Sequence, residues 1–424
     1  MAVIPKHSSR YLILALLWLA YSSSYLLRKP LALVKTHMMS EFRVDLTIIG
    51  FLDVALLLPY SVFSLTIGWL ADSFGARMVL GAGLCLGATS FALIGQVSSL
   101  NSIFFLLFVT GASQALGWPT CSSILTDWFH HSERNSAFGI FGTSAFGGSV
   151  LATYLAVYLL EVMQWQSIFI YCAIIPGACG LLVILLAKSP KEYKLLPVDS
   201  DDQDCKDKLA KSSESLTFFQ VMKLQLLPEI CFSIVCSKCV RYAVLLWLPM
   251  FLQKGLNYST MSAGIGSTAY DIGGVVGSLL NDLLVRYFFR SNNFFASYMT
   301  SILTCVFLGL FTMSGHLGIS MHMILLFLAG LFNSATDILL TGPIAADLGV
   351  QYDARVAVSG VINGMGSLGA VIQGPIVGWV GTTWGWTAVV PCLIILSAVG
   401  ALASFRAFRV QGQRYHLDKM AAET

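Results

Sequence analysis

Residues 188–216 read KSPKEYKLLPVDSDDQDCKDKLAKSSESL and form the longest hydrophilic stretch of a 424-residue chain. The rest of the chain is strongly apolar: 56% of all residues are hydrophobic, 11% are charged, and the mean hydropathy is +0.75. Soluble domains carry about 25% charged residues. The composition therefore excludes a cytosolic globular enzyme, a disordered chain and a nucleic-acid-binding protein, which would need a basic stripe. It indicates a protein that crosses a membrane many times.

Apolar runs flank this stretch on both sides, and a spanning helix needs about 20 mainly apolar residues. Such runs begin near Tyr11, Thr47, Met78, Ser102, Ser136 and Ser167 before the stretch, and near Ile230, Thr260, Phe294, Met321, Val356 and Thr387 after it. The first run is too long for a cleaved signal peptide, so we expect a helix that continues to about Thr36. The sequence predicts an all-α polytopic membrane protein with twelve transmembrane helices in two pseudo-symmetric six-helix bundles.

The hydrophilic stretch also predicts the domain boundaries. We expect an N-terminal six-helix bundle over residues 1–187 and a connecting loop over residues 188–228. A C-terminal six-helix bundle over residues 229–405 and a tail over residues 406–424 follow. A long charged connector between two six-helix halves suggests two bundles joined by a flexible linker.

Basic residues outside the apolar runs predict the side of the membrane that each loop faces. If both termini and the hydrophilic stretch share one side, that side collects Lys6, Arg10, Arg77, Arg134, Lys188, Lys191, Lys194, Lys206, Lys208, Lys211, Lys223, Arg286, Arg290, Arg355, Arg406, Arg409, Arg414 and Lys419. The opposite loops then hold only Lys35, Arg43 and Lys254. Because cytoplasmic loops are enriched in Lys and Arg, we predict that both termini and the connecting loop are cytoplasmic.

The two halves of the chain resemble each other at an offset of about 210 to 221 residues. The matched pairs are Arg28 with Arg241, Asp53 with Asp271, Asp72 with Asp282, Gly148 with Gly369, and Trp165 with Trp386. The glycine-rich runs around Gly148 and Gly369 suit either static close packing of helices or surfaces that slide during a conformational cycle. The repeat predicts duplicated six-helix halves with a site between them.

Four basic residues lie inside apolar runs: Arg28 and Lys29 in the first, and Lys238 and Arg241 in the seventh. A charge at mid-bilayer costs roughly 2.5–3.5 kcal/mol on insertion scales, so each needs a function or a partner. The repeat would bring both arginines to one cavity, where they repel each other unless an anion binds. Because a guanidinium fits phosphate or carboxylate oxygens bidentately, we predict that these residues bind substrate.

Acidic residues accompany these basic ones. Asp53 and Asp271, in the second and eighth runs, either neutralise a nearby Arg or Lys, which we favour, or exchange partners or protons during transport. Asp337 in the tenth run is a further candidate residue of the cavity. Because the intramembrane basic residues outnumber the acidic ones, the cavity is predicted to be positive and suited to a dianion.

Other polar residues have two interpretations each. The hydroxyls of four tyrosines can donate to an anion, although a packing role is equally consistent with the sequence: Tyr25, Tyr60, Tyr242 and Tyr270. Cys236 and Cys239 lie three apart in an apolar run, where packing is favoured over metal ligation. We expect no metal site, no cofactor and no nucleic-acid partner.

A loop motif carries a resemblance to a known family. Gly68-Trp-Leu-Ala-Asp72-Ser-Phe-Gly75-Ala-Arg77 resembles the helix 2–3 loop motif of the major facilitator superfamily, and Ser278-Leu-Leu-Asn-Asp282 resembles a degenerate copy. The resemblance implies the major facilitator fold, with Gly68, Asp72, Gly75, Arg77 and Asp282 in loops that act in the conformational cycle.

Three more segments resemble one branch of that superfamily, the organophosphate:phosphate antiporters. Tyr25-Leu-Leu-Arg28-Lys29 and Arg241-Tyr-Ala-Val-Leu-Leu-Trp247 are similar to its two phosphate-binding arginine segments, and Gln114-Ala-Leu-Gly-Trp118-Pro119 is similar to its helix 4. The segments around Lys35, Asp53 and Asp271 resemble the eukaryotic sugar-phosphate exchangers, the relatives of the glucose-6-phosphate transporter. The resemblance implies substrate contacts at Trp118 and residence in the endoplasmic reticulum or another internal membrane.

The sequence departs from that branch at two positions. Ser64 stands where the bacterial members and the glucose-6-phosphate transporter have a Lys in helix 2, and about Ser144 stands where the bacterial protein has a His. Losing that Lys removes one partner of the phosphate. The departure therefore bears on the counter-substrate more than on the binding of a phosphate ester.

These patterns predict a secondary active transporter that exchanges a phosphorylated sugar or related organophosphate for inorganic phosphate by alternating access. One alternative is a carrier of another organic anion, a carboxylate or a bisphosphonate-like compound, with proton coupling through Asp53 or Asp271. A transport-inactive sensor or scaffold is another. A polytopic enzyme is disfavoured because the sequence offers no cluster of His with Asp or Cys near an interface.

Overall fold

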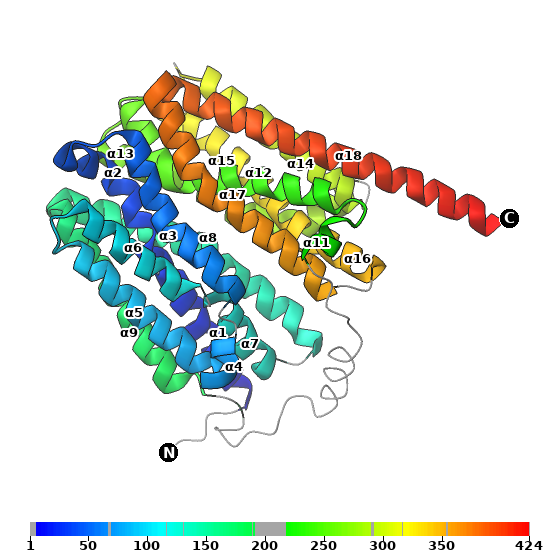
Figure 1. Cartoon of the computed structure of the whole chain (residues 1–424), viewed down its shortest axis with the longest axis horizontal. Helices are drawn as coiled ribbons and strands as arrows, with labels where there is room; N and C mark the ends of the chain where they lie inside the picture. The colour runs from blue at the N-terminus through cyan, green and yellow to red at the C-terminus, as the bar shows by residue number, and fades with distance from the viewer. Residues whose placement is uncertain are drawn as a thin grey trace. The chain divides into compact units, whose positions relative to one another are not determined.

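The computed structural model describes residues 6–66, 69–115, 117–129, 131–188, 190, 218–289, 292–315, 317–352 and 355–423. Within these ranges the regular secondary structure is helical (Figure 1). Most of the predicted connecting loop over residues 188–228 lies outside the described residues. Before that loop the structure contains α1 (Lys6–Ser23), the 3-10 segment η1 (Ser24–Leu27), α2 (Lys29–Phe42), α3 (Leu46–Thr66), α4 (Trp69–Phe74), α5 (Ala76–Ile94), α6 (Leu100–Gln114), α7 (Gly117–Trp128), α8 (His131–Val162) and α9 (Trp165–Leu186).

The second half of the chain is also helical. It contains α11 (Phe218–Met222), α12 (Leu227–Lys254), α13 (Thr260–Leu283), the π-helical segment η2 (Leu284–Phe288), α14 (Asn293–Met313), α15 (Ile319–Thr341), α16 (Pro343–Gln351), α17 (Arg355–Trp384), the 3-10 segment η3 (Trp386–Ala388) and α18 (Val389–Glu423). The helix α18 continues past residue 405, where the C-terminal bundle was predicted to end.

Contacts group these helices into two compact units. The first unit holds α1 to α9 together with residues 257–268, and the second holds α11, α12 and the chain from residue 269 onward. The first part of α13 therefore belongs to one unit and the remainder to the other. The three predicted domain boundaries stay a prediction.

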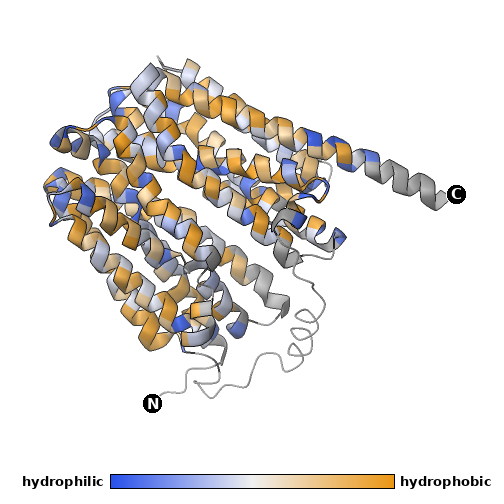
Figure 2. Ribbon diagram, viewed as in Figure 1, coloured by the Kyte–Doolittle hydropathy of each residue, from blue (hydrophilic) through white to orange (hydrophobic). Residues whose placement is uncertain are grey.

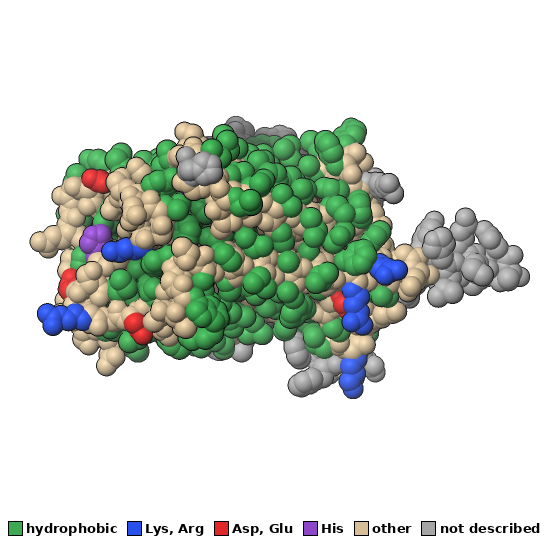
Figure 3. Space-filling view, turned by 90° about the horizontal axis from the view of Figure 1, so that it is seen from above, with side chains coloured by type: hydrophobic (Ala, Val, Ile, Leu, Met, Phe, Trp, Pro, Cys, Tyr) green, Lys and Arg blue, Asp and Glu red, His purple; other side chains and the backbone are tan. Residues whose placement is uncertain are grey.

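Eleven helical segments of the described chain are long and apolar enough to cross a membrane. Together with α13, which corresponds to the predicted eighth span and carries Asp271, they coincide with the twelve predicted runs. Hydrophobic residues dominate the helices in Figure 2, and on the face drawn in Figure 3 hydrophobic side chains cover the middle while charged ones gather toward the ends. Large apolar side chains such as Phe105 and Tyr158 are exposed, as expected where lipid rather than water is the solvent.

The first span differs from its prediction. We expected one helix to about Thr36, but the α-helix stops at Ser23, passes through η1, and restarts as α2, which continues to Phe42. The break is centred on Arg28, whose backbone has φ −132° and ψ −51°. Lys35, which the orientation argument placed in a loop, is consequently inside α2 and fully buried. The equivalent helix of the second half, α12, continues without a break through Arg241.

Glycines bring equivalent helix pairs into close contact in the two units. A Cβ at Gly148 of α8 would meet the backbone of Ser22 in α1, and a Cβ at Gly369 of α17 would collide with the carbonyl oxygen of Val235 in α12. Such approaches are possible only without a side chain. Both glycines therefore have a packing function, which is one of the two roles that their sequence context allowed.

Candidate anion-binding site

Arg28 in the first unit is held at the helix break by a neutral partner and two aromatic rings. Its side chain is buried, and Nε donates a hydrogen bond to Gln114 Oε1 at 2.7 Å. The guanidinium carbon lies 4.6 Å from the ring centroid of Tyr60 and 5.5 Å from that of Tyr25. Aromatic faces attract a cation within about 6 Å of the centroid and orient it without neutralising its charge. Lys29, next in the chain, is also buried.

An aromatic cluster extends from this arginine. Tyr21 packs edge-on against Tyr25 and Trp118, and the Trp118 ring also contacts Phe141. Tyr21, Tyr25 and Phe141 are buried, whereas Trp118 is 38% exposed. The structure thus connects the predicted substrate residues Tyr25, Tyr60 and Trp118 to Arg28, either directly or through Tyr21.

Asp53 pairs with a lysine of the broken first span. Lys35 Nζ of α2 lies 2.8 Å from Asp53 Oδ2 of α3, and both side chains are fully buried. This geometry agrees with the favoured interpretation of Asp53 as a neutralising partner, although its partner is a residue that the sequence argument had assigned to a loop. The pair therefore connects α2, the helix that follows the break in the first span, to α3.

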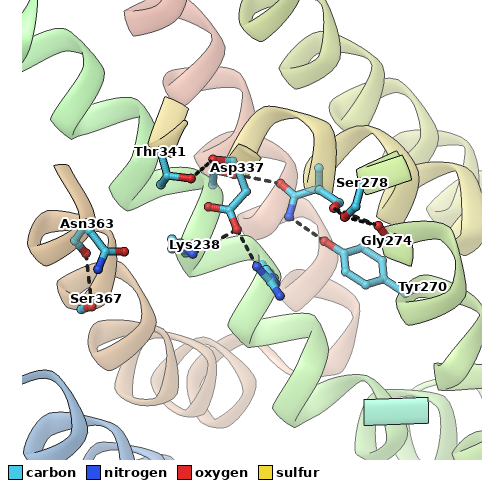
Figure 4. Close-up of polar contacts among 12 residues, drawn as sticks. Lys238, Tyr270, Gly274, Ser278, Asp337, Thr341, Asn363 and Ser367 are labelled. Carbon is cyan, nitrogen blue, oxygen red and sulfur yellow. Dashed lines mark hydrogen bonds and ion pairs between the residues drawn. The ribbon is translucent and has the colours of Figure 1, made fainter. Parts of the chain in front are cut away.

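In the second unit, one acid serves both predicted basic residues. Lys238 and Arg241 are three residues apart on α12, so they share one face of the helix. Asp337 on α15 accepts from Lys238 Nζ at 3.0 Å and from Arg241, both through its Oδ2 atom (Figure 4). Asp337 is thus a fixed acid adjacent to Arg241, whereas Nε of Arg28 donates to an amide oxygen.

A hydrogen-bonded chain continues from this cluster. Ser237 of α12 donates to Asn333 Oδ1 at 3.2 Å, and Asn333 Nδ2 donates to the Tyr270 hydroxyl at 2.7 Å. The chain ties α12, α15 and α13 together one turn away from Asp337. Asp271, the residue after Tyr270, is buried. Tyr242 is half-buried beside Arg241.

Two functional candidates escaped the residue-level predictions. Gln114 lies in the segment that resembles helix 4 of the antiporters, and Asn333 lies in the tenth apolar run, but neither was predicted to be a site residue. Both are buried amides inside apolar helices, and that placement was the available signal, because a buried polar group needs a partner. What sequence could not provide was the identity of the partner.

The loop motif is only partly visible. Gly75 has φ +83°, a conformation that favours glycine, and it is the N-cap residue of α5, two positions before the half-buried Arg77. Gly68 lies outside the described residues, as do the side chains of Asp72 and Asp282. Their predicted part in the conformational cycle stays a prediction.

Comparison with known proteins gives the context for this site. Residues 17–346 match the major facilitator superfamily. The chain is 24% identical to the glucose-6-phosphate exchanger SLC37A2 of Bos taurus, over 93% of this chain and 92% of the relative. It is 27% identical to the glycerol-3-phosphate transporter of Bacillus subtilis (strain 168), over 65% of this chain and 64% of the relative.

Solved structures show the same fold. A bacterial homolog of the human lysosomal transporter Spinster, in an inward-facing and occupied conformation, superposes with a TM-score of 0.74 at 13% identity, covering 94% of this chain and 97% of that one. The nucleoside transporter NupG superposes with a TM-score of 0.73 at 15% identity, covering 93% of this chain and all of that one. At such identities the likeness concerns the fold alone.

Proposed function

The chain belongs to the major facilitator superfamily, and we propose that it is a secondary active transporter that exchanges a phosphorylated sugar or related organophosphate for inorganic phosphate. The observation that carries the proposal is the pair of repeat-related arginines, each oriented by a partner within a chain similar to organophosphate transporters. Phosphorylated sugar and glycerol compounds are the substrates that the relatives' names state. The relatives are transporters, and we propose that this chain is likewise not an enzyme.

In the proposed mechanism, Arg28 and Arg241 supply guanidiniums to the phosphoryl group, with Lys29 and Lys238 as additional cations. Tyr60 and Tyr25 orient Arg28, and the exposed part of Trp118 offers an apolar face to the organic part of the ester. Charge-assisted bidentate bonds to phosphate oxygens supply the binding energy. Alternating access follows if the loaded carrier changes conformation more readily than the empty one.

The test uses the purified chain in liposomes preloaded with phosphate. Uptake of labelled phosphate, followed by competition with glucose 6-phosphate and glycerol 3-phosphate, measures exchange and ester selectivity together. We expect uptake to depend on internal phosphate and both esters to compete. A carboxylate that competes better than either ester would instead favour the second candidate, a carrier of another organic anion.

The second candidate function, a carrier of another organic anion with proton coupling, rests on Asp53 or Asp271. Asp53 is engaged by Lys35 in a fully buried pair, which favours a structural role over proton coupling at that position. Asp271 is buried on α13 and remains a candidate for a role in coupling.

The protein is an integral multi-pass membrane protein, and we propose that its termini and connecting loop are cytoplasmic and that it resides in the endoplasmic reticulum or another internal membrane. The orientation rests on the distribution of Lys and Arg among the loops. Tags placed at either terminus or within residues 188–216 are expected to be accessible from the cytoplasmic side only. Protease cleavage of the connecting loop from the opposite face would contradict this topology.

Ser64 provides a prediction about the counter-substrate. Its hydroxyl bonds only to the helix's own backbone among the contacts of the described chain, donating to the Ser61 carbonyl at 2.8 Å, and its side chain is half-buried on α3. Ser64→Lys is expected to increase the affinity for free phosphate by about 1 kcal/mol, as for a charge near the membrane–water boundary. The affinity for an ester should change less, because the organic part has other contacts.

Competition between phosphate and an ester in wild-type and variant liposomes measures this effect. Ser64→Ala is the matched control, since it removes the hydroxyl without adding charge. Equal movement of both inhibition constants, or weaker phosphate binding, would show that position 64 does not face the substrate.

A further inference from the structure

The Asp337 carboxylate is bound by Lys238 and Arg241 through only one of its two oxygen atoms. Its Oδ2 atom accepts from both Lys238 and Arg241, whereas its Oδ1 atom is buried and has no hydrogen-bond partner among the described residues (Figure 4). Buried carboxylate oxygens are normally paired, so an unpaired one requires an explanation. The acid is anchored by the same groups that are proposed to bind substrate.

The cations are more accessible than the acid that holds them. The side chains of Lys238 and Arg241 are each 17% exposed, and that of Asp337 is 6% exposed. An arriving anion therefore meets the cations first. Since both cations direct their hydrogen bonds to a single carboxylate oxygen, a phosphoryl group that takes those donors competes directly with Asp337.

Displacement would leave a buried carboxylate without a cation. The charged groups that act on Asp337 are Lys238 and Arg241 of α12, and Tyr270 of α13 lies in electrostatic range of Asp337 and of Asp271, the next residue in the chain. Neither residue replaces the lost cations, because a tyrosine side chain is never positively charged and Asp271 is itself acidic. A buried carboxylate without a cation favours its neutral form.

From this geometry we propose that Asp337 is an internal counter-ion which the substrate phosphoryl group displaces from Lys238 and Arg241, and which takes up one proton when it is displaced. The proposal rests on the proposed function, because it needs an anion at these cations. In the step, the two cations transfer their hydrogen bonds from Asp337 to phosphate oxygens, and a buffer acid in solution transfers a proton to the released carboxylate. The O–H bond formed on Asp337 replaces the bond to hydrogen broken in the buffer acid, and no other covalent bond changes.

Competition for the same donors supports this coupling. While Asp337 stays ionised, its Oδ2 atom draws on Lys238 and Arg241, the two cations that the phosphoryl group needs. A proton on Asp337 removes this competing charge and leaves both cations to the bound anion. At the arginine of the first unit, Nε of Arg28 donates to the neutral amide of Gln114.

The test counts protons during binding. Purified chain is titrated with glucose 6-phosphate at about pH 8, where a phosphate monoester is fully dianionic because its second pKa is about 6. Calorimetry in two buffers of different ionisation enthalpy gives the protons taken up per bound ligand. We expect about one proton for the wild type and near zero for Asp337→Asn, which should also bind the ester more tightly because the competing carboxylate is gone.

Thr341→Val is the matched control. Thr341 donates to the backbone carbonyl of Asp337 at 2.8 Å, so this variant perturbs the same turn of α15 and leaves the carboxylate in place. We expect it to take up protons like the wild type. Wild-type binding without proton uptake would overturn the inference even if Asp337→Asn did not fold, and so would equal proton uptake by wild type and Asp337→Asn.

Phosphate exchange in liposomes separates this inference from the function on which it rests. If the wild type exchanges phosphate but binds the ester without proton uptake, only the role of Asp337 is wrong. If the wild type exchanges no phosphate and binds no ester, the proposed function fails and the inference falls with it.

Discussion

Arg28→Ala and Arg241→Ala are each expected to abolish exchange while the protein still folds. Each change removes charge-assisted hydrogen bonds to the phosphoryl group, worth about 3 kcal/mol or a hundredfold in rate. Folding should survive because the partners left behind remain tolerable. Without Arg28, the neutral Gln114 loses one hydrogen bond, and without Arg241, Asp337 still pairs with Lys238 at 3.0 Å. Exchange in liposomes, normalised to the amount of monodisperse protein, measures the loss.

Lysine at either position should restore little activity. At position 28 an ammonium lacks both the Nε donor that reaches Gln114 and the planar group that lies over Tyr60. Arg406→Ala is the matched control, because Arg406 is 75% exposed and its pair with Glu229 at 3.1 Å is a surface pair of little energetic weight. Wild-type rates from either alanine variant at 28 or 241 would rule out the proposed phosphate ligands.

Breaking the pair between Lys35 and Asp53 is expected to cost about 3–5 kcal/mol of stability, because the remaining partner is left as an uncompensated buried charge. Lys35→Met or Asp53→Leu alone should therefore lower the unfolding temperature and the yield of monodisperse protein. The double variant Lys35→Met/Asp53→Leu should recover most of the loss, since apolar residues of similar volume replace a buried pair at little cost. Thermal unfolding in detergent, followed by tryptophan fluorescence, measures all three.

The double variant also distinguishes the two interpretations of Asp53. A stable double variant that exchanges phosphate assigns the pair a structural role. A stable double variant without exchange would assign it a role in coupling. If the double variant unfolded at the same temperature as the single variants, an unpaired buried charge would not be the reason why the single variants are less stable than the wild type.

Much of the fold was predictable from the sequence alone, because hydrophobic length is a local property. Each of the twelve apolar runs coincides with described helical segments, of which the first run contains α1, η1 and α2, and the glycine pair Gly148 and Gly369 marks the close approach of equivalent helices. The break at Arg28 was not predictable in the same way. Backbone polar groups inside a membrane helix normally pair within the helix, and the interruption depends on what surrounds it.

The candidate site was likewise predictable only in part. The sequence by itself determined which residues carry charge into the membrane, because Arg28, Lys29, Lys238 and Arg241 stand out in any apolar run. It also determined that the two arginines are related by a repeat. These conclusions need only composition, spacing and the cost of burying charge.

Only the tertiary structure decided which groups those charges meet. It placed Asp337 against both Lys238 and Arg241, Asp53 against Lys35, and Gln114 against Arg28. The partners come from positions 18 to 99 residues away in the chain, the largest separation being that of Lys238 from Asp337. Spacing along a helix says which residues share its face, but which side chain faces them from another helix depends on how the helices pack, and no local pattern encodes that.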